Sequence, residues 1–522
     1  MLMPLADAHN YLFYGDNLEI LRQRIPDDSV DLCYIDPPFN SKRTYFQIYN
    51  RIGFDDVAQA QAFIDTWVWG PEADQGVQEI LDNAQGRFPP QTVALIQGLR
   101  DVLGAGGLMA YLVHMTLRIT EIHRVLKPTG SFYLHCDPTA SHYLKLILDA
   151  VFCSQGGDFQ NEIIWHYSGW NGNRQQHLNR RHDVILFYTK SRVGTFHPPS
   201  IPWASEDEYV QTRRQKIHYD AQNRSYVLSD GGHGKRVARY LAEAMQYGKP
   251  LDDVWDLAKL NNSAREHLGY PTQKPEALLE RIIQASSNPG DTVLDAYCGC
   301  GTTVAVAQRL GRRWIGIDIT YQAISLILKR LDDSTPDNQR AALHDHLIMH
   351  GVPRDLASAQ ALAHDSRDKT RKEFEKWAIL TYTNNRARIQ HKKGADGGID
   401  GVAAFVIGPS HSAKALFQVK SGHVNRATVA TLRGDMAREQ AELGILLTLQ
   451  KPTKPMIQEA AAAGSYTHPL FPSRQPEPRI RLVTIEELVD QHVRWMMPMT
   501  HDAVKSAQTA NKSLKDDQIR WS

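Results

Sequence analysis

Asp36-Pro37-Pro38-Phe39 carries the clearest chemistry in this chain. Two successive prolines fix φ and push the preceding residue toward an extended conformation, so the backbone leaves a strand rigidly at this point. A carboxylate and an aromatic ring then lie side by side. The carboxylate can accept one N–H of an exocyclic amine, a proline carbonyl can accept the second, and the ring can stack on a planar base. We therefore predict that Asp36, Pro37, Pro38 and Phe39 are catalytic residues that hold an amino-bearing base.

Asp-Pro-Pro alone is also a common turn, but a glycine-rich stretch far downstream supports the chemical interpretation. The stretch reads Asp295-Ala296-Tyr297-Cys298-Gly299-Cys300-Gly301-Thr302-Thr303. It connects an expected buried strand, 291–295, to an expected helix, 303–310. Gly299 and Gly301 allow the backbone to approach a ligand closely, and the N–H groups at the start of the helix favour a carboxylate there.

A second expected strand, 314–317, ends at Asp318. An acid about 20 residues beyond a glycine loop is placed to bind ribose hydroxyls. The loop lacks the G-x-G-x-x-G of a dinucleotide site and the G-K-[ST] of a P-loop, which disfavours NAD and ATP. S-adenosylmethionine has a ribose and a carboxylate but no phosphate, and it is the predicted cofactor. Cys298 and Cys300 raise the alternative of a metal, but no second cysteine pair at zinc spacing accompanies them.

Several separate segments of the first 330 or so residues resemble one family, the DNA amino-methyltransferases in the β arrangement. They are Gly15-Asp16-Asn17-Leu18-Glu19, the Asp36 tetrapeptide, Leu126-Lys127-Pro128-Thr129-Gly130, His182-Asp183-Val184-Ile185-Leu186-Phe187-Tyr188-Thr189-Lys190 and Tyr270-Pro271-Thr272-Gln273-Lys274-Pro275. The resemblance implies an α/β fold with a Rossmann-like parallel sheet. In it, the strand ending at Asp36 lies beside the strand ending at Asp295, at a topological switch point where such sheets bind ligands.

The same resemblance implies a set of cofactor-binding residues. Thr272, Gln273 and Lys274 are expected near the methionine end of the cofactor, and Asp16 near its adenine. The remaining candidates come from the glycine loop and the strand after it: Asp295, Ala296, Tyr297, Gly299, Gly301, Thr302 and Asp318.

The expected reaction begins with flipping of the target nucleotide out of duplex DNA, because the amine is out of reach inside the stack. In the family that this chain resembles, an acid in the first position of the tetrapeptide usually accompanies adenine and a serine usually accompanies cytosine. Asp36 therefore favours N6 of adenine, with N4 of cytosine as the alternative. Methylation of cytosine C5 would need a nucleophilic cysteine after a proline, and none of the five cysteines follows a proline.

Composition is that of an ordinary globular protein of two or three domains, with 522 residues, 42% hydrophobic and 22% charged. Cys33, Cys136, Cys153, Cys298 and Cys300 form no disulfide framework, and the sequence shows no signal peptide or membrane-length apolar run. We therefore expect a cytoplasmic protein with no membrane partner. Because the net charge is only +1, any contact with nucleic acid must be local.

The region 165–264 has this local character, and its position corresponds to the target-recognition insert of the family that the chain resembles. It mixes basic residues with aromatic residues and glycines in loop-rich sequence. Arginine and lysine side chains there can contact phosphates or read guanine edges, although each alone could equally be a solvated surface residue. The DNA-binding candidates are Arg180, Arg181, Arg213, Arg214, Lys235 and Arg236.

A second domain follows the first and carries a second set of candidates. Asp400 precedes an expected strand, and Gln418 and Lys420 lie on the next one. A carboxylate, an amide oxygen and an ammonium around one point could hold Mg²⁺ and polarise a phosphodiester. The pattern resembles the Mrr-like branch of the PD-(D/E)xK nucleases, which adds Glu375 as a further acid and makes Asp400 and Gln418 the metal ligands. The alternative is a hairpin turn beside an edge strand, in a domain that only binds DNA or partners.

The sequence thus predicts a methyltransferase sheet with a recognition insert and a smaller α/β domain of restriction endonuclease type. Two readings of the whole chain stay open: a modification enzyme with a binding domain, or a restriction and modification fusion. Double-stranded DNA is the expected partner, a homodimer is the default assembly, and cleavage at a distance would need a separate restriction or motor subunit because no P-loop is present. The expected segments are a catalytic half, 1–164; the insert, 165–264; a cofactor-binding half, 265–331; a helical connector, 332–372; the nuclease-type domain, 373–500; and a tail, 501–522.

Overall fold

The computed structural model describes most of the chain. The described residues are 9–38, 43–48, 59–65, 67–168, 178–232, 234–246, 248–261, 264–268, 270, 272–364, 368–390, 398–408, 411–497 and 520–521, with the side chains of 43–48, 59–65, 368–371 and 520–521 excepted. Of the predicted site residues, Phe39 lies outside this set.

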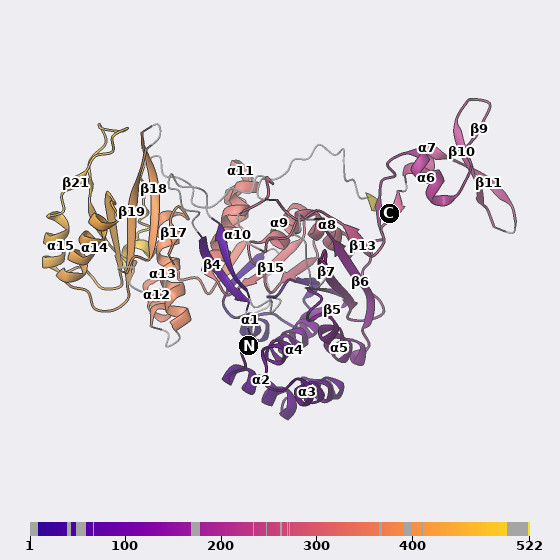
Figure 1. The fold of residues 1–522 in the computed structure, drawn as a ribbon, viewed down its shortest axis with the longest axis horizontal. Helices are drawn as coiled ribbons and strands as arrows, with labels where there is room; N and C mark the ends of the chain where they lie inside the picture. The colour runs from indigo at the N-terminus through magenta and orange to yellow at the C-terminus, as the bar shows by residue number, and fades with distance from the viewer. Residues whose placement is uncertain are drawn as a thin grey trace.

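A nine-stranded sheet forms the centre of the molecule (Figure 1), in the order β13-β6-β7-β5-β2-β14-β15-β1-β16. The pairs from β5 through β16 are parallel, whereas β7 runs antiparallel to both β5 and β6. The strands are β1 (Asn10–Tyr14), β2 (Val30–Ile35), β5 (Leu126–Cys136), β6 (Asp158–His166), β7 (His182–Thr189), β13 (Val254–Asp256), β14 (Thr292–Asp295), β15 (Arg313–Asp318) and β16 (Leu347–His350). The expected Rossmann-like arrangement is confirmed, because β2 and β14 are neighbours although they are far apart in sequence.

Helices cover both faces of this sheet. Alternate residues of β2 belong to two different hydrophobic clusters, Leu32 and Tyr34 to one, Cys33 and Ile35 to the other, as expected for a strand buried on both sides. One face packs against α1 (Asn17–Arg24), α2 (Pro71–Asp82), α3 (Pro90–Leu103), α4 (Gly107–Val125) and α5 (Ser141–Val151), which is followed by η1 (Cys153–Gln155). The other packs against α8 (Glu276–Ala285), α9 (Thr302–Arg309), α10 (Tyr321–Ser334) and α11 (Asp337–Asp345). Within the described residues, no helix combines the length and the apolar character needed to cross a bilayer.

Gly301, at the start of α9, shows how closely α10 packs on this helix. Its φ is +75°, and an added Cβ would lie 2.6 Å from Cγ1 of Ile327. We expect Gly301→Ala to lower the free energy of unfolding by about 2–4 kcal/mol, because it combines backbone strain with overpacking. Gly311→Ala is the matched control, since Gly311 has a similar φ of +71° but nothing within 4 Å. Denaturant unfolding would contradict this account if both variants lost the same stability.

The region 165–264, expected to be a recognition insert, divides between the central sheet and a separate folded unit: β7 and β13 belong to the sheet, whereas residues 199–250 form a small unit with its own core. Figure 1 shows its strands extending away from the main sheet, and Trp203, Tyr209, Val227, Leu241 and Ala244 form its separate core. Its elements are β8 (Pro199–Ile201), α6 (Glu206–Arg213), β9 (His218–Tyr219), β10 (Ser225–Asp230), β11 (Arg236–Tyr240), α7 (Leu241–Gln246) and β12 (Lys249–Pro250). β24 (Arg520–Trp521) pairs with β8, and a separate hairpin joins β3 (Arg43–Ile48) to β4 (Gln59–Asp65).

The C-terminal domain is built on a five-stranded sheet in the order β17-β18-β19-β20-β23. Its strands are β17 (Arg388–Ile389), β18 (Gly401–Gly408), β19 (His411–Lys420), β20 (Leu443–Thr448) and β23 (Ile480–Thr484), and β21 (Ser465–Tyr466) pairs with β22 (Glu477–Pro478). The helices are α13 (Asp368–Thr383), α14 (Arg426–Arg438), α15 (Lys454–Ala461) and α16 (Ile485–Val489). The segment expected as a helical connector, 332–372, contains α11 and α12 (Leu356–Ala363) but also β16, which extends the main sheet by pairing with β1.

Candidate functional site

Two loops that are distant in sequence meet where β2 and β14 end. The strands pair in parallel through Leu32↔Val293 and Cys33↔Leu294, so Asp36 and Asp295 emerge at the same edge of the sheet. The amide of Asn17 donates to the carbonyl of Ala296 at 2.8 Å, which ties the start of α1 to the glycine loop. The juxtaposition on which the sequence interpretation depends is therefore present in the fold.

Lys274 connects the two loops. Its ammonium forms an ion pair with the Asp36 carboxylate, and both side chains are largely buried. Its backbone carbonyl accepts the hydroxyl of Thr302 at 3.4 Å. Lys274 was predicted near the methionine end of the cofactor; the structure places it between the glycine loop and Asp36, so it can contribute to both.

The glycine loop is shaped by contacts within the protein. The Asp295 carboxylate accepts the hydroxyl of Thr303 at 2.6 Å and the N–H of Tyr297 at 3.0 Å, and burial raises its pKa to about 7. The close approaches that require glycine are made by the Tyr270 ring to Gly299 and by Ile327 to Gly301. Gly301 supplies no side-chain cap to α9, so the first N–H groups of that helix point toward the loop as donors for an anion.

Asp318, at the end of β15, joins the glycine loop to the start of α10. One carboxylate oxygen accepts the N–H of Gly299 at 2.9 Å, and the other accepts both the N–H and the hydroxyl of Thr320, each at 2.9 Å. Burial raises the pKa of Asp318 to about 6 in spite of these bonds. These donors and acceptors fit the groups of S-adenosylmethionine. Asp318 is an acid that can accept ribose hydroxyls, the start of α9 can bind the methionine carboxylate, and the loop lacks the motif of a phosphate-binding site.

The raised pKa of Asp318 predicts a pH dependence of cofactor binding. An ionised carboxylate accepts ribose hydroxyls better than a protonated one, so the affinity should rise as the pH passes upward through about 6. We expect S-adenosylmethionine to bind roughly tenfold more weakly at pH 5 than at pH 7.5 in calorimetry. The α-carboxyl group of an amino acid titrates well below this range. Asp295, with a pKa of about 7, titrates within it, so the change is assigned to Asp318 only if Asp318→Asn removes it. An affinity that stayed level or rose toward pH 5 would exclude Asp318 as the ribose acid.

The other predicted cofactor residues have clear structural partners. Asp16 caps α1 by accepting the N–H of Leu18 at 2.9 Å and pairs with Arg118 at 2.9 Å. Gln273 holds the preceding loop, since its amide oxygen accepts the N–H of Leu268 at 2.8 Å. Tyr297 directs its hydroxyl to His114, at 2.8 Å. Ala296 and Thr302 are buried in the loop and Thr272 is half-buried next to Gln273.

A network of buried polar groups beneath the Asp36 loop was not predicted. The hydroxyl of Tyr34 lies 2.9 Å from Nδ1 of His135, and Nε2 of His135 lies 3.4 Å from Asp183. Tyr167 donates to the other oxygen of Asp183 at 3.0 Å. Because an ionised Asp183 can only accept, His135 donates from Nε2 and receives the Tyr34 hydroxyl at Nδ1.

The charge of this network resides on Asp183. Burial opposes its ionisation, but the hydrogen bond from His135, with help from two nearby lysines, keeps the pKa of Asp183 below its usual range. One of these lysines, Lys259, places its ammonium 3.6 Å from the Tyr167 ring centroid. Burial lowers the pKa of Lys259 despite the neighbouring carboxylates. Tyr34 lay in the strand predicted to precede the Asp36 tetrapeptide, Asp183 in a segment that resembles the family, and Lys259 in the expected insert. The contacts that join Tyr34 and Asp183 through His135 were not predicted.

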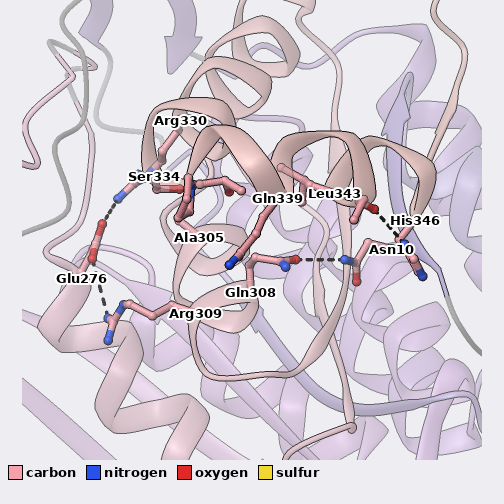
Figure 2. Close-up of a pocket in the computed structure, with 13 residues that line it drawn as sticks. Asn10, Glu276, Ala305, Gln308, Arg309, Arg330, Ser334, Gln339, Leu343 and His346 are labelled. Carbon is pink, nitrogen blue, oxygen red and sulfur yellow. Dashed lines mark hydrogen bonds and ion pairs between the residues drawn. The ribbon is translucent and has the colours of Figure 1, made fainter.

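A separate cavity of about 550 Å³ lies behind the glycine loop, between α9, α10 and α11 (Figure 2). The buried guanidinium of Arg330 crosses this region, donating to Glu276 at 2.6 Å and to the hydroxyl of Thr302 at 3.1 Å. None of the predicted cofactor residues lines the cavity. Arg330 therefore fixes the glycine loop from behind, and this cavity is distinct from the strand-end site.

In the C-terminal domain, the structure brings three of the four nuclease candidates together. Asp400 precedes β18 and accepts the N–H of Val419, between Gln418 and Lys420 on β19, at 2.8 Å. The amide nitrogen of Gln418 and the ammonium of Lys420 both approach Gly398: a Cβ added to this glycine would lie 3.9 Å from each of them. Glu375 is half-buried on α13, a helix that packs against β19.

Asp435 of α14, which was not predicted, also belongs to this cluster. It is buried and accepts the Gln418 amide nitrogen at 2.8 Å, which turns the amide oxygen to the opposite side. Within the described residues, no three histidine, cysteine, aspartate or glutamate side chains are grouped to hold a metal ion. A Mg²⁺ site here would therefore depend on Asp400 together with the Gln418 amide oxygen, which are ligand types that Mg²⁺ accepts.

Comparison with known families identifies both domains. Residues 30–329, more than half of the chain, match the family described as DNA methylase, and residues 367–491 match the family described as restriction endonuclease. The chain belongs to the DNA methylase family. Its second domain is of the Mrr-like endonuclease family, as the sequence predicted.

Individual relatives cover mainly the methylase part. The chain is 28% identical to the DNA adenine methyltransferase YhdJ of Escherichia coli over 62% of this chain and 82% of that protein. It is 32% identical to the type II methyltransferase M.HpaI of Haemophilus parainfluenzae over 41% of this chain and 57% of that protein. Among solved structures, the cytosine-N4-specific PvuII DNA methyltransferase matches with 14% identity and a TM-score of 0.36, over 65% of this chain and 94% of that one.

The DNA-binding candidates lie in three different places in the region 165–264. Arg213 and Arg214 end α6, whereas Lys235 and Arg236 lie at the turn into β11, and all four are exposed. Arg180 is exposed before β7, and the adjacent Arg181 is half-buried and accepts the N–H of Tyr167 through its carbonyl at 3.0 Å. The basic residues thus extend from the edge of the catalytic site to the far strands of the insert.

Proposed function

We propose that this DNA methylase transfers a methyl group from S-adenosylmethionine to the exocyclic N6 of a flipped-out adenine in duplex DNA. The observation that supports the proposal most is the meeting of Asp36 and the glycine loop at the ends of β2 and β14, with Lys274 contacting both. An acid at position 36 favours adenine in the family, and one relative is named as an adenine methyltransferase. Methylation of cytosine N4 is the alternative.

Some residues of the site would bind the cofactor, and others would position the target amine. Asp318 would bind the ribose, the start of α9 would bind the methionine carboxylate, and bound S-adenosylmethionine would supply an electrophilic methyl group. Flipping the base costs a few kcal/mol. Stacking on an aromatic ring such as Phe39 returns roughly 1–3 kcal/mol, so the pocket largely offsets this cost. Asp36 and the Pro37 carbonyl would accept the two amine N–H groups and so hold the nitrogen in line for attack.

Long-read sequencing of DNA from cells that express the chain tests the base and the target sequence together. We expect N6-methyladenine at one short motif. Signals for N4-methylcytosine instead would support the alternative base, and unmodified DNA from cells containing the folded protein would contradict methyl transfer.

We also propose that the exposed basic residues of the insert contact DNA. Arg213, Arg214, Lys235 and Arg236 are exposed on a unit that projects from the catalytic sheet. Contacts of this kind release counterions, so binding should weaken steeply as salt increases.

For the C-terminal domain we propose Mg²⁺-dependent DNA cleavage, which would make the chain a restriction and modification fusion. Asp400, Gln418 and Lys420 lie together at one edge of the sheet, and the Val419 N–H fixes the Asp400 carboxylate. Asp400 and Gln418 would hold the metal ion, and the Lys420 ammonium would face the scissile phosphate. The alternative is a domain that binds DNA without cutting it.

Assembly with further chains is a separate proposal. We propose a homodimer as the working assembly, with a separate restriction or motor subunit where cleavage occurs at a distance from the target. Light scattering after size-exclusion chromatography tests the first part, since a monomeric mass at micromolar concentration would exclude a stable dimer.

A further inference from the structure

We propose that the C-terminal domain supplies a positioning residue for cofactor binding: Glu373 of α13 holds the turn that presents Asp318 to the ribose. The inference rests on the proposed S-adenosylmethionine site. It assigns to Glu373 a part in methyl transfer, although this residue lies within the segment that matches the restriction endonuclease family.

The geometry of the turn provides the first argument. Thr320 donates its N–H and its hydroxyl to Asp318, each at 2.9 Å. The next N–H along the chain, that of Tyr321, donates to Glu373 at 2.9 Å. Two successive N–H groups at the start of α10 are therefore held by two carboxylates, one from each domain. The start of a helix favours negative charge, so both carboxylates stabilise the same orientation of this turn.

Burial and packing make this contact a fixed one. Glu373 is 7% exposed, and Lys376 pairs with its second oxygen at 2.6 Å. The hydroxyl of Tyr321 lies 3.0 Å from that of Thr381, also on α13. Ile324 and Ile327 of α10 share one hydrophobic core with Phe374 and Trp377 of α13. The first helix of the C-terminal domain is therefore part of the wall of the cofactor site rather than a tethered neighbour.

Charge provides a second, independent argument. Glu373 contributes to raising the pKa of Asp318, after the larger effect of burial, so its carboxylate is close enough to act on the ribose acid. The groups that face Asp318 from the surrounding elements are Tyr14 at the end of β1, Tyr270 before α8, Asp295 and Cys298 of the glycine loop, and Glu373. Of these, Glu373 is the acid contributed by the C-terminal domain.

Calorimetric titration of the full chain with S-adenosylmethionine tests the proposal. We expect Glu373→Ala to weaken binding roughly tenfold at pH 7.5, because it removes a hydrogen bond to a charged group. Glu373→Gln keeps an acceptor for the Tyr321 N–H and should bind nearly normally at that pH. In Glu373→Gln, the pH below which S-adenosylmethionine binding weakens should shift to a lower value, because a negative charge near Asp318 is gone. A purely structural role of Glu373 would leave that pH unchanged.

Two further variants separate the possible outcomes. Glu439→Gln makes the same change on a partly exposed carboxylate at the end of α14 and should leave binding within twofold. Asp318→Asn should weaken binding strongly. If Asp318→Asn has no effect, the proposed cofactor site fails; if it does but both Glu373 variants bind and titrate like the unaltered chain, only the present inference fails.

Hydrogen exchange covers the case in which Glu373→Ala does not fold. In the unaltered chain, saturating S-adenosylmethionine should slow exchange of the backbone amides of α13 as well as those of the turn at Thr320 and Tyr321. Slower exchange at the glycine loop with no change in α13 would overturn the proposal.

Discussion

Asp36→Ala is expected to reduce methyl transfer by about 10³-fold while S-adenosylmethionine still binds. The carboxylate would hold the target amine at the point of attack, and no other acid at the end of β2 can replace it. The proposed cofactor-binding residues lie instead on the glycine loop and at Asp318, which hydrogen bonds within the protein hold in place. The measurement is transfer of a radiolabelled methyl group to duplex DNA, with calorimetry for the cofactor.

Asp36→Asn refines this test. The amide keeps one acceptor oxygen for the amine but loses the ion pair with Lys274, so we expect a smaller loss, of about 10²-fold. Asp82→Asn, at the exposed end of α2, is the control and should have no effect. Methyl transfer by Asp36→Ala at the rate of the unaltered chain would refute the assigned role of the tetrapeptide.

Lys420→Ala is expected to reduce Mg²⁺-dependent cleavage of unmethylated plasmid by about 10³-fold, because an ammonium that offsets charge at the scissile phosphate is lost. Methyl transfer should be unchanged, since Lys420 lies on β19, in a different sheet from Asp36. Agarose gels of supercoiled plasmid, run with and without S-adenosylmethionine, measure the first effect.

Lys414→Ala is the matched control for this experiment. Lys414 lies on the same strand, at the other end, where its ammonium contacts the carbonyl of Glu439 at 3.2 Å. Loss of cleavage in Lys420→Ala alone would support the assigned site. If the unaltered chain leaves plasmid intact under every Mg²⁺ and cofactor condition, the fusion proposal is wrong, and the alternative of a domain that only binds DNA or partners is favoured.

The elements around the catalytic loops were predictable because local signals agreed with the fold. The strand predicted to end at the Asp36 tetrapeptide is observed as β2, and the helix after the glycine loop begins one residue earlier than predicted, at Thr302. Apolar runs bounded by glycine and proline specify such short buried strands. The pairing of β2 with β14 could be inferred only from resemblance, because periodicity within one segment contains no information about a partner hundreds of residues away.

The groups that sequence did not reveal are those whose roles arise from tertiary contacts. In the sequence, nothing distinguishes His135 from the other buried residues of its strand. Its role follows from the fold, in which Tyr34 and Asp183 lie on either side of it. Glu373 is one of several charged residues at the start of α13, and only docking on α10 distinguishes it. Asp435 likewise gains a role only when α14 packs over β19. Long-range contacts between ordinary residue types leave no local pattern.

The separate core of the insert has a consequence for how target preference can change. Trp203, Tyr209 and Val227 pack on one another and not on the central sheet, so substitutions on the outer strands β9, β10 and β11 cost the catalytic fold little stability. If these strands read the target, a lineage can acquire new DNA sites by altering or exchanging this unit while the chemistry stays constant. Target recognition could then change in one hydrophobic core while the core that supports catalysis stays the same.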